Sequence, residues 1–506
     1  MLTSSAHRTQ TDAPRRPRAA PTAAAMAVVA ALAYSAISLY RHDRFGSTLD
    51  LATQGQTVWG YSHFEIIPNT VIGIPNLLGD HFHPVLMTLA PLFWIWDSAA
   101  VLLVAQAVLI ALAGIPIFLW GAERLGDLAG LAFQASFYGF WGILAGVLFD
   151  FHHVVFAVAA MSGALYATVT RRNHLLAPMV GVAMLTREDV ALTLIALGFY
   201  ILVVQRRYLL GGVLMAANAA WFLLLLGTIM PALGGVPYRH WTYTSLGSGP
   251  IDAALNVLRN PLRAIELLFI PLAKMRIWVA SFGSWLFLPL LSPLTLVALP
   301  SFVERFWNGP DFWTFHMQYS MLSAPILAFA AIDGVARIKS FRWASTRVRL
   351  PAQLAVTSFL ITVVLTVAVN PLAELGTYVS GTTAADIQTC IDVIPSDASV
   401  AATQNLLAHL ATRRRVYQIP IQNTNGSTID PVAAGVDYIA IDIATEGNDS
   451  RFRDVVRSAF SAGYGVVCTR ELTAILRKGA SSQTLTQQLD QWLAGNCAGR
   501  ACLPTD

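Results

Sequence analysis

Residues 23–40 (AAAMAVVAALAYSAISLY) carry no charge and are almost wholly apolar, and residues 41–97 then mix histidine, aspartate and aromatic residues with short apolar runs. A helix that crosses a membrane needs about 20 apolar residues. The first segment therefore predicts a membrane-spanning helix. Because no small-residue cleavage site follows it, we expect a retained span rather than a removed signal peptide. The second segment predicts a large loop whose helices lie on the membrane surface.

The composition of the whole chain indicates a polytopic membrane protein that is mainly α-helical. Of its 506 residues, 55% are hydrophobic and only 12% are charged, whereas soluble globular proteins carry roughly 25% charged residues. This excludes a soluble enzyme, a disordered protein and a nucleic-acid binder. The formal net charge of +4 is too small to indicate a polyanionic partner, and the short arginine clusters between apolar runs indicate topology instead.

The arginine-rich residues 1–22 predict a disordered cytoplasmic tail, because positive charge beside a first span stays inside. The large loop 41–97 then lies outside. Hydropathy predicts ten further spans within a transmembrane domain of residues 23–370, so we expect about eleven transmembrane helices. These further spans are 98–120, 128–148, 154–170, 175–186, 190–204, 209–230, 276–291, 293–305, 317–336 and 352–370.

Residues 371–506 have a soluble composition, and an odd number of spans places them outside the membrane as an extracytoplasmic domain. Short apolar strands that alternate with helices predict a small α/β domain with a mainly parallel sheet. No glycine-rich phosphate loop follows any strand, so nucleotide binding is unsupported. The predicted strands are 398–402, 415–419, 437–443 and 464–468, and the predicted helices are 403–412 and 451–462.

All four cysteines lie in this domain, at Cys390, Cys468, Cys497 and Cys502. Outside the membrane, thiols form disulfides. The alternative is that four cysteines gather there by chance. The sequence does not fix their connectivity.

Ionisable residues at membrane depth or at the membrane surface are costly and mark candidate functional sites. Several lie at the outer ends of separate predicted spans. The first is Asp50 in DLATQGQTVW, which also contains Gln54. A carboxylate on the outer face can accept a proton from an acceptor hydroxyl as a general base. The alternative is that Asp50 caps the helix that follows it.

The motif GDHFHP brings together Asp80, His81 and His83. Two histidines two positions apart can chelate a metal ion, and they can equally bind a phosphate or a sugar hydroxyl. The alternative is an interfacial loop rich in amphipathic residues. A His-x-His pair is a weak signal by itself.

Two further groups lie at predicted outer ends. Asp150 and His152 belong to FDFHH, and Arg187, Glu188 and Asp189 separate two short apolar runs. Three adjacent charges are costly there unless they are paired or face a wet cavity. The planar fork of Arg187 matches phosphate oxygens, and the alternative is a simple outer turn.

His316 and Tyr319 belong to the aromatic stretch ERFWNGPDFWTFHMQYS, which begins with Glu304 and Arg305. Aromatic side chains line sugar sites by stacking, but they also form the interfacial belt of any membrane protein. The belt accounts for most of them.

The sequence contains no other catalytic signature: no Walker loop, no His-Glu-x-x-His, no Gly-x-Ser-x-Gly and no haem motif. Transporters carry polar or broken helices near the membrane midplane. Here the charged residues gather on one side, which favours a surface-facing active site over a conduction path.

The order of the motifs DLATQGQTVW, GDHFHP, FDFHH and TREDVAL, followed by IPSDASVAATQNLLAHLATRRRVYQIP and VDYIAID, resembles a bacterial membrane family known as domain of unknown function 2079. The resemblance covers about residues 35–445. That family in turn resembles the GT-C superfamily of membrane glycosyltransferases. The resemblance implies a GT-C-like fold and the transfer of a sugar from a polyprenyl-phosphate carrier to an extracytoplasmic acceptor, with inversion at the anomeric carbon.

By this resemblance, Asp50 matches the acid of the first outer loop and would be the catalytic base. Many GT-C members carry adjacent acids there, whereas Leu51 follows Asp50 here, which leaves metal dependence open. The residues that would hold a divalent ion, or else the donor phosphate, are His81, His83, Asp150 and His152. The predicted substrate-binding residues are Gln54, Asp80, His81, His83, Asp150, His152, Arg187, Glu188, Asp189, His316 and Tyr319.

We therefore expect a glycosyltransferase of the bacterial plasma membrane, with a lipid-linked sugar as co-substrate and a cell-envelope glycan, glycolipid or protein as acceptor. One alternative is a transporter or flippase for a lipid-linked envelope precursor. Another is a non-catalytic membrane scaffold whose outer domain binds a partner.

Overall fold

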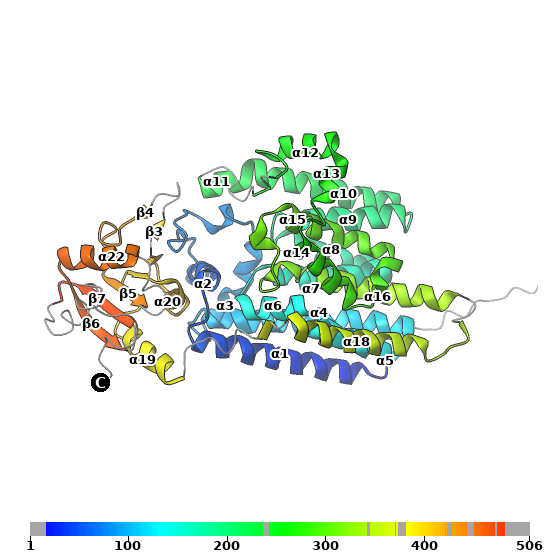
Figure 1. The fold of residues 1–506 in the computed structure, drawn as a ribbon, viewed down its shortest axis with the longest axis horizontal. Helices are drawn as coiled ribbons and strands as arrows, with labels where there is room; N and C mark the ends of the chain where they lie inside the picture. Colours follow the sequence, from blue (N-terminus) through cyan, green and yellow to red (C-terminus); the bar gives the residue numbers. More distant parts are fainter. Residues whose placement is uncertain are drawn as a thin grey trace, which may run out of the picture.

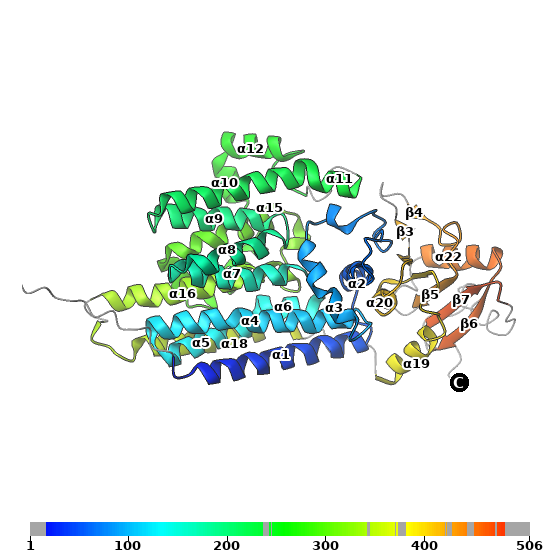
Figure 2. The same cartoon turned by 180° about the vertical axis from the view of Figure 1, so that it is seen from behind.

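The computed structural model describes residues 17–235, 242–243, 245–341, 345–369, 371–372, 381–419, 421–422, 428–442, 450–470 and 473–480. Most of them are helical, and a small sheet follows near the C-terminus. In Figures 1 and 2 the long helices run side by side, the sheet lies beyond one end of the bundle, and helix α2 lies between the two.

The helical part begins at Ala20, three residues before the predicted first span, and residues 1–16 of the predicted tail lie outside the described residues. Its helices are α1 (Ala20–Asp43), α2 (Leu49–Ser62), α3 (Ala90–Phe93), α4 (Ala100–Leu125), α5 (Asp127–Gly139), α6 (Trp141–Phe149), α7 (Val154–Val169), α8 (Asn173–Met184), α9 (Val190–Val203), α10 (Tyr208–Leu224), α11 (Met230–Gly234), α12 (Pro250–Arg259), α13 (Pro261–Glu266), α14 (Leu272–Gly283), α15 (Leu299–Trp307), α16 (Ser323–Ser340) and α18 (Leu350–Val369).

Within the described residues, five helices are long and apolar enough to cross a membrane, and the pair α5 and α6, bent by 41°, adds a sixth. The protein is thus mainly helical with several apolar spans, as predicted. The count of about eleven stays a prediction. The five are Ala20–Asp43, Ala100–Leu125, Tyr208–Gly234, Gln318–Ser340 and Leu350–Val369.

Prolines explain why two of the predicted spans do not form long helices. The span predicted at 293–305 is a 3₁₀ segment, Pro293–Ala298, followed by the nine-residue helix α15. The span predicted at 276–291 ends as an α-helix at Gly283 and continues into a second 3₁₀ segment, Leu288–Leu291. Proline has no N–H to donate and clashes with the preceding turn, so these apolar runs form short pieces instead of one long helix.

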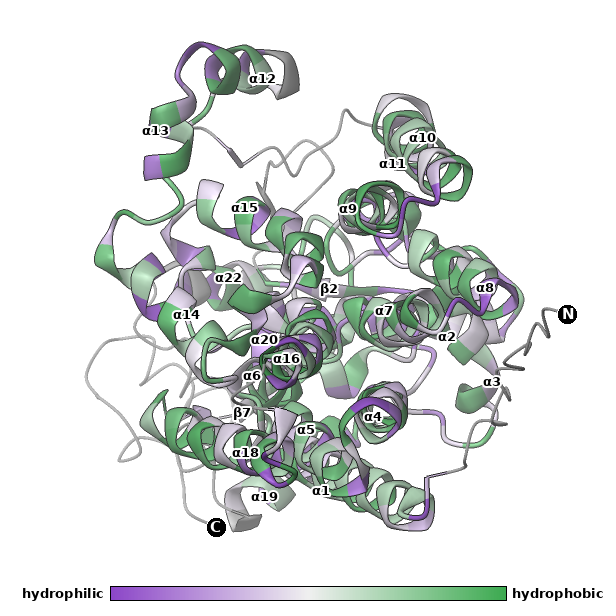
Figure 3. Cartoon of the chain, turned by 90° about the vertical axis from the view of Figure 1, so that its right-hand side faces the viewer, coloured by the Kyte–Doolittle hydropathy of each residue, from purple (hydrophilic) through white to green (hydrophobic). Residues whose placement is uncertain are grey.

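Burial separates central helices from peripheral ones. The apolar span Gln318–Ser340, which contains α16, is 78% buried inside the protein. The spans formed by α1 and α18 are each only 22% buried. The end-on view in Figure 3 agrees, because α16 lies inside the bundle and α1 and α18 lie at its edge. Hydrophobic side chains such as Val29 and Leu32 of α1 are exposed, which is favourable only in contact with lipid.

The C-terminal sheet has the strand order β2-β1-β5-β7-β6. Strand β1 pairs in parallel with β2 and β5, whereas β7 pairs antiparallel with β5 and β6. The prediction of a mainly parallel sheet was therefore wrong. Only two residues separate β6 from β7, and so short a connection joins antiparallel neighbours. The strands are β1 (Val400–Ala402), β2 (Val416–Gln418), β5 (Tyr438–Asp442), β6 (Tyr464–Arg470) and β7 (Thr473–Lys478).

Of the remaining elements of this part, two helices overlap the predicted helices 403–412 and 451–462, and the others were not predicted. A two-stranded pair, β3 (Ile421–Gln422) and β4 (Thr428–Ile429), lies beside the main sheet, and the helices are α19 (Gly381–Ile391), α20 (Gln404–Leu407) and α22 (Ser450–Ser461). Cys390 on α19 forms a disulfide with Cys468 on β6. Cys497 and Cys502 lie outside the described residues.

Helix α2 lies at the contact between the bundle and the C-terminal part, together with the end of α1 and the loop after α2. A Cβ atom on Gly55 would lie 2.7 Å from Cβ of Ala99 and 3.3 Å from Cβ of Ala411, so glycine allows α2 to approach both sides. The buried Gln56 donates from Nε2 to Oγ1 of Thr70 and to the carbonyl of Arg414. These contacts fix the helix whose first turn carries the predicted base, Asp50.

Candidate active site

Helix α2 is held at its first turn by a carboxylate that is distant in sequence. Thr48 occupies the N-cap position, but its side chain makes no capping bond. Instead, Oδ2 of Asp150 accepts hydrogen bonds from the backbone N–H of Thr48 at 3.0 Å and of Leu51 at 3.4 Å. Oδ1 of Asp150 is paired with Arg41 of α1 at 2.6 Å. Asp50 therefore lies in the first turn of α2 without being its cap.

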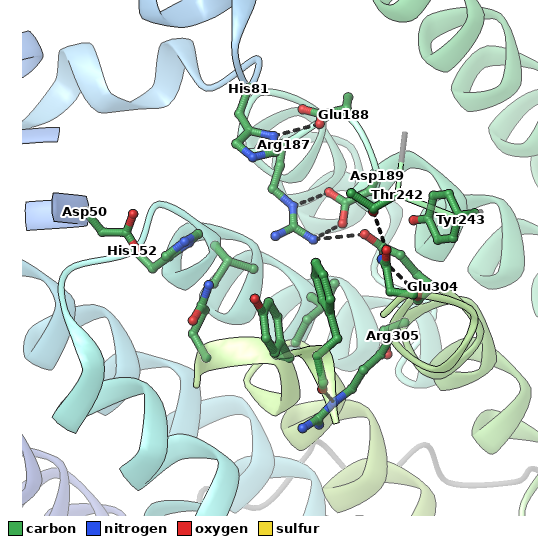
Figure 4. A pocket seen from close by; sticks show the side chains of 17 residues that line it. Asp50, His81, His152, Arg187, Glu188, Asp189, Thr242, Tyr243, Glu304 and Arg305 are labelled. Carbon is green, nitrogen blue, oxygen red and sulfur yellow. Dashed lines mark hydrogen bonds and ion pairs between the residues drawn. The ribbon is translucent and has the colours of Figure 1, made fainter. Parts of the chain in front are cut away.

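Asp50 faces a cavity of about 270 Å³ between α2, the segment after α8, and α15. Figure 4 shows Asp50 and His152 on one side of this cavity and Arg187 with its acidic neighbours on the other. Removal from water raises the pKa of Asp50 to about 7, and the nearby carboxylate of Asp150 acts in the same direction. Asp50 is thus a carboxylate able to exchange a proton near neutral pH.

Opposite Asp50, charged groups pair with one another. Arg187 binds Asp189 through two nitrogens and lies 3.4 Å from Oε1 of Glu304. Nδ1 of His81 lies 2.8 Å from Oε1 of the buried Glu188. This pairing offsets the cost of placing three adjacent charges, at positions 187–189, between two apolar segments. Such pairing, or a wet cavity, was expected from the sequence.

The His81–Glu188 pair shifts both titrations. Burial lowers the pKa of His81, but the carboxylates of Glu188 and Asp80 together raise it more, so the net shift is upward. Burial raises the pKa of Glu188, but His81, Arg187 and a backbone hydrogen bond together more than offset this, and the pKa falls to about 2. Both shifts favour the ionised pair, and this salt bridge connects the segment between α2 and α3 to the turn before α9.

Three imidazoles gather around that of His153. Its ring centroid lies 4.6 Å from that of His83, 4.8 Å from that of His152 and 5.6 Å from that of His81. Gln54 approaches Nδ1 of His153 at 3.4 Å. Burial lowers the pKa of His83 to about 4, with a further contribution from His81.

The predicted divalent ion can be tested against these side chains. Asp150 is engaged by Arg41 and by the first turn of α2, and His81 is engaged by Glu188. In the part of the chain that the structure describes, no three His, Cys, Asp or Glu side chains converge as a set of metal ligands. The described side chains do not fit the ion, so no step below is routed through one.

The structure brings together some of the residues predicted from the sequence and separates others. Asp50, His81, His152, Arg187, Glu188, Asp189 and Tyr319 line the cavity. The other predicted residues do not line it. Gln54 and His83 lie beside His153, and Asp150 supports the first turn of α2. Asp80 precedes His81 in the loop, and His316 is exposed in the segment after α15.

Sequence reasoning did not select several other residues of the cavity. Tyr243, Asn308 and Gln318 line it. Glu304, which was named from the sequence without a role, also lines the cavity and brings a second carboxylate to Arg187. Glu304, Asn308 and Gln318 belong to the aromatic stretch already singled out, so that motif was an available signal. Tyr243 follows an apolar helix with no pattern that marks it.

Arg305 also lines the cavity, but its guanidinium is committed to structure. It donates to the carbonyls of Phe312 and Thr314 and to Ser320, and thereby fixes the segment after α15. In Figure 4 it points away from Arg187. Its role is to position the loop that carries Tyr319.

The chain is similar to one known protein family over most of its length. The model of a family described as "Predicted membrane protein (DUF2079)" matches residues 41–470. No curated protein matches the chain.

Solved structures of similar fold include ArnT from Cupriavidus metallidurans bound to undecaprenyl phosphate, at 13% identity and a TM-score of 0.52. The apo state of the same protein matches at 14% identity and a TM-score of 0.51. Each comparison covers 90% of this chain and 98% of the other. At such low identity the likeness shows a common fold, in agreement with the GT-C resemblance given by the sequence motifs.

Proposed function

This chain belongs to the predicted membrane proteins of family DUF2079, and from that premise we propose that it is a membrane glycosyltransferase. It would move a sugar from a polyprenyl-phosphate carrier to an acceptor outside the cytoplasm. The observation that carries the proposal is Asp50, a carboxylate with a pKa raised to about 7 that lines a cavity opposite a cluster of charged and aromatic side chains. The ArnT-like fold supports it, since one ArnT structure holds undecaprenyl phosphate.

In the proposed reaction, the Asp50 carboxylate accepts the proton of an acceptor hydroxyl. The hydroxyl oxygen attacks the anomeric carbon of the donor sugar, and the bond from that carbon to the phosphate oxygen breaks. The phosphate leaves with the electron pair, which gives a glycosylated acceptor and free polyprenyl phosphate. A raised pKa suits this role, because a base whose pKa lies near the ambient pH combines availability with proton affinity.

The other residues of the cavity have supporting roles in this proposal. Tyr319, with Phe312 stacked on it at 4.7 Å between centroids, offers an aromatic face to a sugar. Arg187 is already neutralised by Asp189 and Glu304, so we assign it to sugar hydroxyls in place of the phosphate contact suggested by its sequence. Glu188 and His81 close the outer loop over the cavity.

The membrane arrangement belongs to the same proposal. We place the protein in the bacterial plasma membrane with about eleven spans, the N-terminus in the cytoplasm and the C-terminal α/β part outside. The acceptor would be a cell-envelope glycan, a glycolipid or a protein, and it would approach Asp50 from the outer face.

Glycan profiling of the cell envelope in a deletion strain tests the function. The strain is complemented with the wild-type gene, with Asp50→Asn or with Asp97→Asn, all at equal protein level. Asp97 is an exposed acid at the end of the same outer loop, so it controls for the loss of a surface charge. We expect one sugar to disappear on deletion, to return with wild type and Asp97→Asn, and to stay absent with Asp50→Asn.

The alternatives give different results. A profile restored by Asp50→Asn would remove the base from the mechanism and would favour a flippase or a scaffold. A flippase would in addition accumulate its lipid-linked precursor on the cytoplasmic side in the deletion strain. Equal amounts of folded protein, measured by detergent-solubilised size-exclusion chromatography, are required of all variants.

A further inference from the structure

Helix α4 carries a buried polar side chain, Gln106, that the proposed reaction does not explain. It lies near the start of a helix that is long and apolar enough to cross a membrane, and it is 1% exposed. A buried amide is costly unless its nitrogen and its oxygen both form hydrogen bonds. The partners of Gln106 therefore indicate its role.

Both polar atoms of Gln106 bond to the backbone between α6 and α7. Nε2 donates to the carbonyl of Asp150 at 2.9 Å and to the carbonyl of Gly146 at 3.3 Å. Oε1 accepts from the N–H of His152 at 2.9 Å. An amide nitrogen is a donor and its oxygen is only an acceptor, so the reverse orientation would place each atom against a group of its own kind. These contacts fix the side chain in one orientation.

The bonds occupy backbone groups that the break between two helices leaves without helical partners. Helix α6 ends at Phe149, α7 begins at Val154, and the backbone at Asp150 is extended. The last four carbonyls of a helix, which here include that of Gly146, have no partner within the helix. In a membrane protein such groups must be bonded by other parts of the protein. Gln106 thus stabilises the turn between α6 and α7 from a separate helix.

This turn supports the proposed base. Its carboxylate, that of Asp150, accepts from the backbone N–H groups of Thr48 and Leu51 in the first turn of α2. Asp50 lies between those two residues in sequence. A shift of the α6–α7 turn would therefore shift the start of α2 and, with it, the Asp50 carboxylate.

The same turn supplies a second side chain to the cavity. His152 lines it, and Figure 4 shows His152 beside Asp50 on one side. The backbone N–H of His152 is the group that Gln106 accepts from. Gln106 does not itself line the cavity, but it fixes the backbone on which two of the lining residues depend.

We propose that Gln106 is a positioning residue for the sugar transfer, which holds Asp50 and His152 in place through the turn between α6 and α7. This inference rests on the proposed function, because it assigns a role within the same site. It predicts two effects that can be measured separately. One is the stability of the first turn of α2, which depends on no reaction, and the other is the rate of transfer.

Hydrogen–deuterium exchange of the full chain in detergent tests the first effect. Gln106→Met retains a side chain of similar length but removes all three hydrogen bonds. The amide protons of Thr48 and Leu51 should then exchange about tenfold faster, because local opening at the start of α2 costs less free energy.

Gln134→Met provides the matched control. Gln134 is also a fully buried glutamine of an apolar helix, α5, but it donates to the carbonyl of Ala23 and to the hydroxyl of Tyr138. Figure 1 shows α5 toward the end of the bundle opposite α2. This variant removes comparable hydrogen bonds, so it should lower overall stability and leave exchange in the first turn of α2 unchanged.

Initial rates in membrane vesicles test the second effect, with the lipid-linked form of the sugar identified by glycan profiling as donor. Gln106→Met should lower kcat about tenfold or more and keep KM within about twofold, because a misplaced base affects the transition state more than donor binding. Gln106→Glu should restore most of kcat. It keeps an oxygen that accepts from His152 and, when protonated, an O–H that donates to the carbonyl of Asp150. Gln134→Met should retain the wild-type kcat per folded molecule.

The remaining outcomes separate this inference from the proposed function. Unchanged exchange at Thr48 and Leu51 in Gln106→Met, or an equal increase in Gln134→Met, would overturn the positioning role. So would faster exchange with an unaltered kcat. If wild-type vesicles transfer no sugar although the exchange result holds, the proposed function fails and the support of α2 by Gln106 stands. If Gln106→Met does not fold, Gln106→Asn gives the same comparison, because its shorter side chain cannot reach the same backbone groups.

Discussion

The carboxylate of Asp150 accepts a hydrogen bond from the backbone N–H of Thr48 at 3.0 Å, although 102 positions separate the two residues. The same carboxylate neutralises Arg41, and both charged groups are buried. The turn between α6 and α7 thus fixes the end of α1 and the start of α2. Asp50 lies next to this junction, so its position depends on a residue that does not line the cavity.

Asp150→Asn should therefore destabilise the whole chain. It leaves the Arg41 guanidinium buried without a counter-charge, and loss of one partner of a buried ion pair costs about 3–5 kcal/mol. Thermal unfolding in detergent measures the effect. Asp454→Asn, which removes an exposed pair with Arg457, should change stability by less than about 1 kcal/mol. Equal unfolding temperatures for the two variants would contradict the buried pairing.

A matched pair of glycine substitutions tests the packing of α2. Gly55→Ala places Cβ 2.7 Å from Cβ of Ala99 and 3.3 Å from Cβ of Ala411, and overpacking of this kind costs about 1–3 kcal/mol. Gly181→Ala, on α8, meets nothing within 4 Å and should be neutral or stabilising, because alanine favours a helix over glycine by about 1 kcal/mol. The unfolding temperature should thus fall for Gly55→Ala and should stay the same or rise for Gly181→Ala. A stable Gly55→Ala would show that α2 does not approach Ala99 and Ala411 so closely.

The sequence predicted the class of this protein better than the details of its site. Apolar runs such as 98–120 report helices directly, because burial in lipid requires long uncharged segments. The bend at Phe140 and the 3₁₀ segments around Pro289 and Pro293 were not predicted, since hydropathy averages over the residues that break a helix.

The residues of the site show the same limit. Asp50, His81 and Arg187 were selected because charge is costly in an apolar chain, and all three line one cavity. The same rule also selected Asp150, whose charge is balanced by Arg41 in a supporting role. Hydropathy cannot distinguish a charge that faces a cavity from one that pairs with a distant helix, because the pairing is set by tertiary structure.

The salt bridge between His81 and Glu188 should make stability depend on pH in a defined way. The pKa of Glu188 is lowered from 4.5 to about 2, so its contribution is present above pH 4.5 and is lost as the pH falls toward 2. The pKa of His81 is raised above 6.5, so its contribution is complete below pH 6.5 and is lost as the pH rises through the raised value. The pair therefore stabilises most between about pH 4.5 and 6.5.

Glu188→Gln should lower the unfolding temperature most at pH 5–6, and the difference from wild type should shrink in alkaline buffer. Glu266→Gln removes a carboxylate from an exposed pair and should give a small difference with little dependence on pH. A Glu188→Gln difference that stays constant from pH 5 to pH 10 would show that His81 does not titrate against Glu188.

The disulfide between Cys390 and Cys468 gives a prediction about topology. It closes a loop of 78 positions in sequence, and it persists only in an oxidising compartment. In a background that carries Cys497→Ser and Cys502→Ser, intact cells should label with a membrane-impermeant maleimide only after treatment with a reductant. Labelling without reductant, or none after it, would contradict an oxidised domain outside the cytoplasm.

Removal of the same bridge should destabilise the C-terminal part. Replacement of Cys390 and Cys468 by serine should cost about 2–4 kcal/mol and should increase the rate of limited proteolysis between residues 381 and 480. The bundle should keep its unfolding transition, because the bridge joins α19 to β6 and no helix of the bundle.

The pH dependence of sugar transfer should report the titration of Asp50. A general base must be deprotonated, and removal from water raises the pKa of Asp50 to about 7. Below that pH the initial rate in membrane vesicles should fall about tenfold per pH unit, since the fraction of carboxylate falls by that factor. Asp97→Asn should leave this profile in place.

Arg41→Met provides the sharper test, because it changes the pKa of Asp50 while the Asp50 side chain itself stays in place. Arg41 lowers the pKa of Asp50, whereas the carboxylate of Asp150 raises it. Loss of Arg41 should therefore move the acidic limb of the profile to higher pH, in membranes that retain folded protein. A limb that does not move, or that moves to lower pH, would mean that a group other than Asp50 takes the proton from the acceptor.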